Sequence, residues 1–266
     1  MTRTHARAAW LAAVLTAALA LAGCAAEPGS RPDASSPTDA APATLTVFAA
    51  ASVAEAFEEI ADGFEARHPH LEVVVNSGGS GALAQQIVAG APADVFASAA
   101  QPPMQQVVDA GLAEAPTDFA TNTLELVVPA GNPAGVSGLD DLDRPELRVA
   151  LCDASVPCGA ASVELLERAG LTAVPDTLES DVKAVLTKVI LDEVDAALVY
   201  RTDVIAAGAA VEGIEVPTAA SVVNHYPIAA MSDAASSDAG AAAAFVAFVT
   251  GTEGRAVLEA AGFGAP

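Results

Sequence analysis

Basic residues are scarce in this chain of 266 residues: 11 Lys and Arg stand against 34 Asp and Glu, a formal net charge of −23 at pH 7. Nucleic acids and anionic membrane surfaces attract basic proteins, so this balance argues against either as a partner. Acidity instead suits the solubility of an Ala-rich protein. A small anionic ligand is not excluded, because salt screens charges beyond about 8 Å while local dipoles act at shorter range.

Cysteine is also scarce, and no enzyme motif is evident. Of the 3 Cys residues, Cys24 lies near the amino terminus and Cys152 and Cys158 share one predicted loop. The pair lacks redox Cys-x-x-Cys spacing, and no neighbouring His or second Cys pair completes a zinc pattern, so we expect no metal ligands. The sequence is compatible either with a disulfide between Cys152 and Cys158 or with two free thiols. Without a nucleophile elbow, a paired-carboxylate motif or a Ser-His-Asp arrangement, we expect a binding protein and not an enzyme.

The amino terminus is typical of an export signal. Arg3 and Arg7 precede an apolar run, residues 8–22, that is too short to cross a bilayer comfortably. The sequence Leu21-Ala-Gly-Cys24 resembles the bacterial lipobox, in which the Cys is lipidated and becomes the first residue of the mature chain. We therefore predict a lipoprotein signal peptide over 1–23 and lipid anchoring of Cys24 to the outer face of the cell membrane. The alternative is an ordinary signal peptide with an incidental Cys.

A flexible tether is predicted to follow, over residues 24–43. From Ala25 this segment consists mostly of Pro, Ser, Ala, Asp and Thr, and it cannot bury enough apolar surface to fold. Residues 44–266 remain for the folded part, which is enough for one large domain or two small lobes.

The folded part alternates strand and helix patterns, which predicts an α/β protein with a mostly parallel sheet. Strands are predicted over 45–48, 71–75, 93–97, 123–129, 148–152, 196–200 and 222–231. Helices are predicted over 53–67, 82–89, 104–110, 159–169, 182–190 and 241–261.

Four segments place a small polar or Gly-flanked residue where a helical pattern begins. They are residues 48–52, 77–81, 156–159 and 179–182. Helix starts present unpaired backbone N–H groups and the positive end of the helix dipole, so several of them converging form an anion pocket without Lys or Arg. In open α/β sheets such loops lie at the carboxyl ends of the strands, where ligands bind.

Four motifs carry a family resemblance: Thr46–Ser52, Ser80–Ile87, Gly90–Ser98 and Leu198–Tyr200. Together they are similar to the molybdate-binding proteins of bacterial ABC importers. The resemblance implies a type II periplasmic-binding-protein fold, in which two α/β lobes joined by two crossing strands close on a ligand. We assign residues 44–125 and 226–266 to lobe 1, and residues 126–225 to lobe 2.

The resemblance also implies which residues contact the ligand. Ser52 and Ser80 would donate from their hydroxyl and backbone groups, Cys158 and Val182 from backbone N–H groups, and Tyr200 from its phenolic O–H. The family pattern has Ala where this chain has Cys158, a change that a main-chain contact tolerates. Each residue also has a plainer interpretation, with the serines as helix caps and Tyr200 packed at a sheet edge.

The expected function is capture of molybdate, and also tungstate, for delivery to an ABC permease by a monomer without a cofactor. A fully deprotonated dianion accepts hydrogen bonds and donates none, so a pocket of donors alone fits it, whereas a protonated oxyanion calls for an acceptor. Sulfate is equally deprotonated, so a receptor for sulfate or another tetrahedral oxyanion is the first alternative. An enzyme on the same scaffold is the second.

Overall fold

The computed structural model describes residues 43–232 and 240–266. The predicted signal peptide (1–23), Cys24 and nearly all of the predicted tether (24–43) lie outside these residues. One boundary was wrong by a residue: Ala43 pairs with Leu71 and begins the first strand, so it does not belong to the tether.

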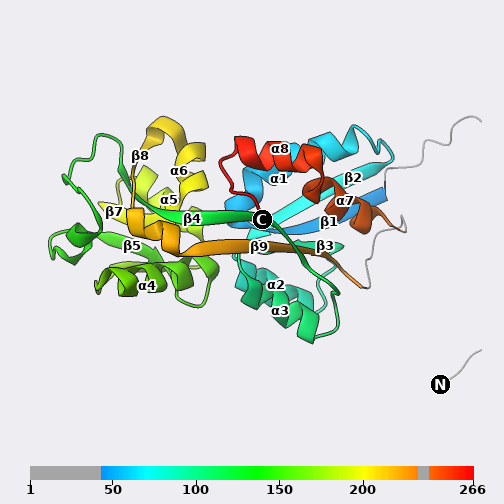
Figure 1. The fold of residues 1–266 in the computed structure, drawn as a ribbon, viewed down its shortest axis with the longest axis horizontal. Coiled ribbons are helices and arrows are strands. Elements are labelled where there is room, and N and C mark those ends of the chain that lie inside the picture. The colour runs from blue at the N-terminus through cyan, green and yellow to red at the C-terminus, as the bar shows by residue number, and fades with distance from the viewer. Residues whose placement is uncertain (1–42, 233–239) are drawn as a thin grey trace, which may run out of the picture. The chain divides into compact units, whose positions relative to one another are not determined.

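Lobe 1 is built on parallel strands covered by helices, as the alternation predicts (Figure 1). Its strands are β1 (Ala43–Ala50), β2 (Leu71–Gly78) and β3 (Val95–Ala97). Its helices are α1 (Ala54–Glu65), α2 (Ser80–Val88) and α3 (Gln101–Asp109). A short 3₁₀ helix, Ala51–Val53, connects β1 to α1.

Two antiparallel strands, β4 (Thr117–Pro129) and β9 (Val223–Ala230), cross between the lobes (Figure 1). Residues 117–123 of β4 pair with β9, and residues 124–127 pair with a strand of lobe 2. The strand predicted from the sequence begins only at Thr123. The residues before it are mostly polar and show no clear β pattern, and they form a strand because they pair with β9. The lobe boundaries at 125/126 and 225/226 fall within these strands and stay a prediction.

Lobe 2 repeats the α/β arrangement. Its strands are β5 (Val149–Cys152), β6 (Thr177–Glu179), β7 (Ala196–Tyr200) and β8 (Val211–Ile214). Its helices are α4 (Pro157–Ala169), α5 (Val182–Ile190) and α6 (Arg201–Ala207). The short elements β6, β8 and α6 were not predicted, because segments of 3 to 7 residues give little periodicity.

The carboxyl-terminal helix predicted over 241–261 is two helices, α7 (Ala241–Thr250) and α8 (Thr252–Ala260). The break falls at Gly251, whose extended ψ of −178° ends α7. The two helices are bent by 55° and together have the length and apolar composition of a membrane span, a test that the core helices of soluble proteins also pass. No single helix in the described ranges is long and apolar enough to cross a membrane.

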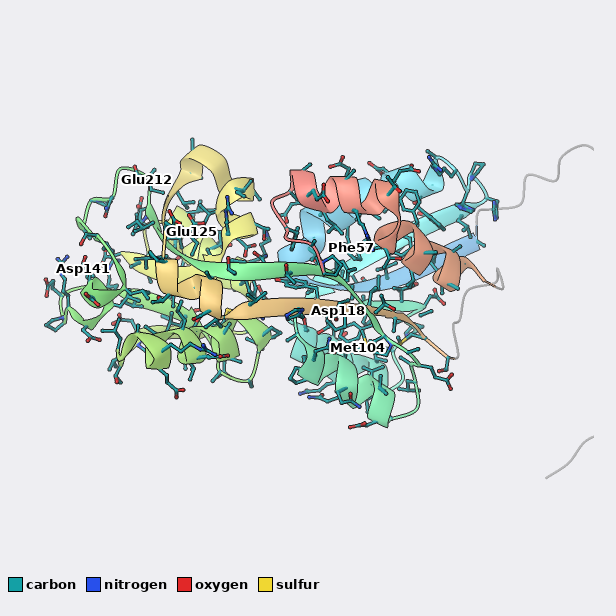
Figure 2. The ribbon with its side chains drawn as sticks, viewed as in Figure 1. Phe57, Met104, Asp118, Glu125, Asp141 and Glu212 are labelled. Carbon is teal, nitrogen blue, oxygen red and sulfur yellow. A yellow bond between two sulfur atoms is a disulfide. The ribbon has the colours of Figure 1, made fainter. Side chains whose placement is uncertain are left out.

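The hydrophobic core is divided between the lobes. One cluster draws only on residues 124–222, and two others draw on residues 45–120 and 226–263. Within lobe 1, Phe57 and Met104 belong to different clusters and lie on opposite sides of the sheet (Figure 2). Each lobe thus has its own packed interior, and the surfaces where they meet are free to form a site.

Candidate ligand-binding site

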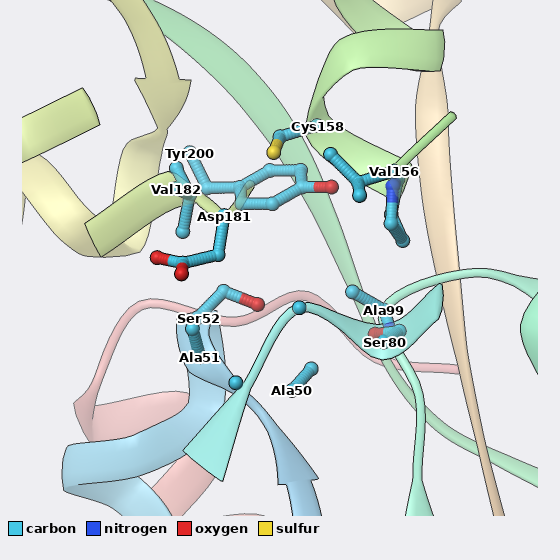
Figure 3. A pocket seen from close by; sticks show the side chains of 13 residues that line it. Ala50, Ala51, Ser52, Ser80, Ala99, Val156, Cys158, Asp181, Val182 and Tyr200 are labelled. Atoms are coloured by element: carbon cyan, nitrogen blue, oxygen red, sulfur yellow. The ribbon is translucent and has the colours of Figure 1, made fainter. Parts of the chain in front are cut away.

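One small pocket lies where the two lobes meet, and all five predicted ligand residues line it (Figure 3). Its lining is mostly small residues, which let the backbone approach the centre closely. The lining consists of Ala50, Ala51, Ser52, Gly78, Gly79, Ser80, Ala99, Val156, Pro157, Cys158, Asp181, Val182 and Tyr200. Ser52 and Ser80 come from lobe 1; Cys158, Val182 and Tyr200 come from lobe 2.

Three helices begin at the pocket and turn their first N–H groups toward it. Ser80 is the first residue of α2, Val182 is the first of α5, and Cys158 is the second of α4 after Pro157. Their N–H groups have no backbone acceptor within residues 43–232 and 240–266. Free amides and three positive dipole ends therefore lie around one small volume, at three of the four segments that the sequence singles out; the fourth, residues 48–52, leads into a 3₁₀ helix.

The Ser80 hydroxyl is arranged as a donor. Its Oγ accepts a hydrogen bond from the backbone N–H of Ala99 at 3.0 Å, and both residues are buried. This bond holds the side chain in place and leaves the hydroxyl proton for another partner. The helix-cap interpretation is wrong here, because Gly79 occupies the cap position and no side chain caps α2.

The Ser52 hydroxyl is held in a similar way by a residue distant in sequence. Ser52 lies in the 3₁₀ helix after β1 and is 5% exposed. Its Oγ is 3.0 Å from the hydroxyl of Tyr226, on crossing strand β9. No side-chain cap involving Ser52 forms at this helix start either.

The Tyr200 hydroxyl is buried without a hydrogen bond. Tyr200 is 1% exposed, and its oxygen has no partner within the described residues. Tyr226 and Asn224 lie near enough to influence its pKa, but neither meets hydrogen-bond geometry with it. Burial raises that pKa well above its ordinary value, so the group keeps its proton. A buried donor without an acceptor is costly, and a ligand in the pocket would supply the acceptor.

The charge around the pocket comes from the backbone, because none of the described residues lining it is Lys or Arg. The one charged residue in the lining is Asp181, which caps α5 by accepting the N–H of Ala184 at 2.9 Å. Figure 3 shows its carboxylate turned away from the side to which the Ser52 and Tyr200 hydroxyls point. Asp181 is therefore a capping residue of α5.

Cys152 and Cys158 form a disulfide that joins the end of β5 to the first turn of α4. Of the two states that the sequence allows, the structure has the bridged one. The crosslink fixes the loop that carries the Cys158 N–H, and both cysteines are buried.

The lobes touch at the edge of the pocket in two ways. Lys183 of α5 forms ion pairs with Glu55 of lobe 1 at 2.7 Å and with Asp203 of α6 at 3.0 Å. Burial raises the pKa of Asp203 to about 6, although Lys183 opposes this shift. At the second contact, a Cβ added to Gly79 would overlap the carbonyl oxygen of Ser180, so this glycine allows the lobes to approach.

Sequence reasoning missed the residues that support the ligand donors. Tyr226 lies within a predicted strand and Asn122 directly before one, so each stood out only as a polar residue in a β pattern. Asp94 accepts the backbone N–H of Thr46 at 2.7 Å and is not among the residues of the pocket.

Known proteins resemble this chain over most of its length. Residues 45–264 match the family of bacterial extracellular solute-binding proteins. The molybdate-binding protein ModA of Mycobacterium tuberculosis is 42% identical over 255 residues, which cover 95% of this chain and 97% of the relative. The periplasmic molybdate-binding protein of Azotobacter vinelandii has a TM-score of 0.71 at 23% identity, covering 84% of this chain and 99% of the other.

A sulfate-binding protein has a similar structure. SubI of Mycobacterium tuberculosis has a TM-score of 0.68 at 20% identity, covering 83% of this chain and 86% of the other. At such identities the likeness shows the fold alone. It confirms the predicted class: two α/β lobes of the type II periplasmic-binding-protein kind, with two crossing strands between them.

Proposed function

Because the chain belongs to the family of bacterial extracellular solute-binding proteins, we propose that it captures molybdate, and also tungstate, in the pocket between its lobes. The 42% identity to a protein named for molybdate binding supports this ligand. Tungstate has the same charge and tetrahedral shape, so the same donors would hold it.

The observation that carries the proposal is the convergence of donors from both lobes without a cation. Ser52 and Ser80 present hydroxyls whose oxygens already have partners, and Tyr200 presents a hydroxyl with none. The N–H groups of Cys158 and Val182 complete the set. A dianion accepts from all of these groups at once, and its bonds to both lobes favour their closure.

Sulfate is the second candidate, because a pocket made only of donors suits any fully deprotonated tetrahedral ion and a sulfate-binding protein shares the fold. Charge and protonation do not separate sulfate from molybdate, so the size of the closed cavity must do so. Since the family is one of solute binding, catalysis on this scaffold is not proposed.

A thermal-shift screen against molybdate, tungstate, sulfate and phosphate tests the ligand, followed by calorimetric titration. A ligand at one hundred times its Kd stabilises the native state by about 2.7 kcal/mol. For a protein of this size that is a rise of roughly 5 to 10 °C in the unfolding midpoint. We expect this rise with molybdate and tungstate; a rise with sulfate alone would favour the second candidate.

Anchoring and delivery are further parts of the proposal. We propose that Cys24 is lipidated, that the chain works as a monomer on the outer face of the cell membrane, and that it passes its ligand to an ABC permease. In the native host, Cys24→Ser should move the protein from the membrane fraction to the soluble fraction. A variant that stays with the membrane would contradict the anchor.

A further inference from the structure

We propose that Tyr226 is a positioning residue that turns the Ser52 hydroxyl proton toward the bound oxyanion, and that it thereby helps the pocket reject oxyanions that carry a proton. The proposal rests on the proposed function and deepens it. The starting observation is the 3.0 Å contact between the Tyr226 hydroxyl and Ser52 Oγ, which are 174 residues apart in the sequence. Either oxygen can donate in this pair, so a third group must set its direction.

Asn122 sets that direction. Its Oδ1 accepts the backbone N–H of Thr123 at 3.0 Å, and a backbone N–H can only donate, so the orientation of the amide is fixed. Its Nδ2 then donates to Thr202 Oγ1 at 2.8 Å and, over a longer 3.5 Å, to the Tyr226 hydroxyl. Tyr226 therefore receives a hydrogen bond from Asn122.

The Tyr226 proton is directed to Ser52 as a result. Tyr226 is fully buried, and burial raises its pKa above the ordinary value, so the hydroxyl keeps its proton. Asn122 donates to the Tyr226 oxygen, and the neighbouring Tyr200 hydroxyl makes no hydrogen bond within the described residues, so Ser52 Oγ is the acceptor within reach of the Tyr226 proton. The Ser52 proton cannot point back along the same line, so it is left for the pocket.

The two serines of the pocket thus share one arrangement. Ser80 Oγ accepts the N–H of Ala99, and Ser52 Oγ accepts the O–H of Tyr226. In each case a donor from another residue occupies a lone pair of the serine Oγ, so the hydroxyl proton of that serine stays available to the ligand. A protonated oxyanion needs an acceptor in the pocket, and this arrangement withholds one.

The hydrogen-bonded chain also runs through the crossing strands. Asn122 lies on β4 and Tyr226 on β9, while Thr202 belongs to α6 of lobe 2 and Ser52 to lobe 1. The orientation of one ligand donor therefore depends on the two strands that connect the lobes.

A double-mutant cycle on molybdate affinity tests the positioning role. Tyr226→Phe keeps the ring and removes only the hydroxyl. Loss of one neutral hydrogen bond predicts roughly two- to tenfold weaker binding. In a Ser52→Ala background the same change should have no further effect, because the proton that it orients is gone. If the two effects multiply, Tyr226 acts independently of Ser52 and the proposal is wrong.

Asn122→Asp provides a second route to the same answer, should Tyr226→Phe fail to fold. It replaces the amide donor by an acceptor of the same shape, which draws the Tyr226 proton away from Ser52 and should also weaken binding. Thr121→Val is the matched control on the same strand: its hydroxyl donates to the carbonyl of Ala265, and molybdate affinity should not change. Unchanged affinity in Asn122→Asp would overturn the proposal.

The selectivity is tested by displacement of molybdate with excess phosphate at neutral pH. Phosphate should displace molybdate from Tyr226→Phe at a lower concentration than from the unaltered protein, because Ser52 Oγ is then able to accept. Equal displacement from both proteins would show that Tyr226 has no part in selectivity. If the unaltered protein binds sulfate and not molybdate, the proposed ligand is wrong, and the same cycle run with sulfate still decides the role of Tyr226.

Discussion

Replacing Tyr200 by Phe should change stability and affinity in opposite directions. The substitution removes one oxygen and keeps the buried ring. In the structure that hydroxyl is buried and has no hydrogen-bond partner within the described residues. Its removal therefore breaks no bond within the protein, but it takes a donor away from the ligand.

The two expected magnitudes follow from this geometry. A buried polar group without a partner costs about 1 to 3 kcal/mol, so the ligand-free variant should be as stable as the parent or more stable. A hydrogen bond to a charged ligand contributes about 1.5 to 3 kcal/mol, so molybdate should bind roughly 10- to 150-fold more weakly. Thermal unfolding without ligand gives the first quantity, and calorimetric titration gives the second.

Ser80→Ala is the informative comparison. It also removes one hydroxyl, and affinity should fall roughly tenfold or more. Here, however, the buried N–H of Ala99 loses its acceptor, so stability without ligand should fall as well, by about 1 to 3 kcal/mol. If Tyr200→Phe binds molybdate as tightly as the parent, or loses as much stability as Ser80→Ala, the Tyr200 hydroxyl is not a ligand donor.

Three further predictions concern lobe closure, the disulfide and a buried carboxylate. Gly79→Ala places a methyl group against the carbonyl oxygen of Ser180, and overpacking strain should weaken molybdate binding roughly tenfold in calorimetry; unchanged affinity would show that the lobes need not approach there. Replacing Cys152 and Cys158 together by Ser opens a loop with a sequence separation of 6 and should lower the unfolding free energy by roughly 2 kcal/mol, measured as a lower thermal midpoint; an unchanged midpoint would argue against a structural crosslink. Burial raises the pKa of Asp203 from 3.8 to about 6, so the folded state binds the proton more tightly than the unfolded state does. The stability that this proton contributes to the folded state is therefore lost as the pH rises from about 4 through 6. The stability of Asp203→Asn relative to the parent should therefore increase by roughly 2 kcal/mol between about pH 4 and pH 7, and a difference that stays constant with pH would contradict the shift.

The sequence predicts the features that rest on local patterns. Alternating strands and helices identify the α/β class, and the helix starts at Ser80, Pro157 and Val182 lie where the polar and Gly-flanked signals place them. These signals depend on neighbouring residues, so no knowledge of tertiary packing is needed. The resemblance to a family then indicates that these helix starts lie together in one ligand site.

Features that depend on long-range contacts could not be predicted in this way. The contact of Ser52 with Tyr226 joins residues 174 positions apart, and the overlap that Gly79 avoids involves a carbonyl of the other lobe. The first half of β4 is polar in sequence and becomes a strand because β9 pairs with it. Gly251 ends α7 within a segment whose apolar pattern continues to α8.

A crystal structure of the protein with molybdate tests the central claim most directly. We predict one ion between the lobes, within hydrogen-bond distance of the Ser52, Ser80 and Tyr200 hydroxyls and of the N–H groups of Cys158 and Val182, with no cationic side chain in contact. An ion bound to Arg or Lys, or a cleft between the lobes that contains no ion, would contradict it.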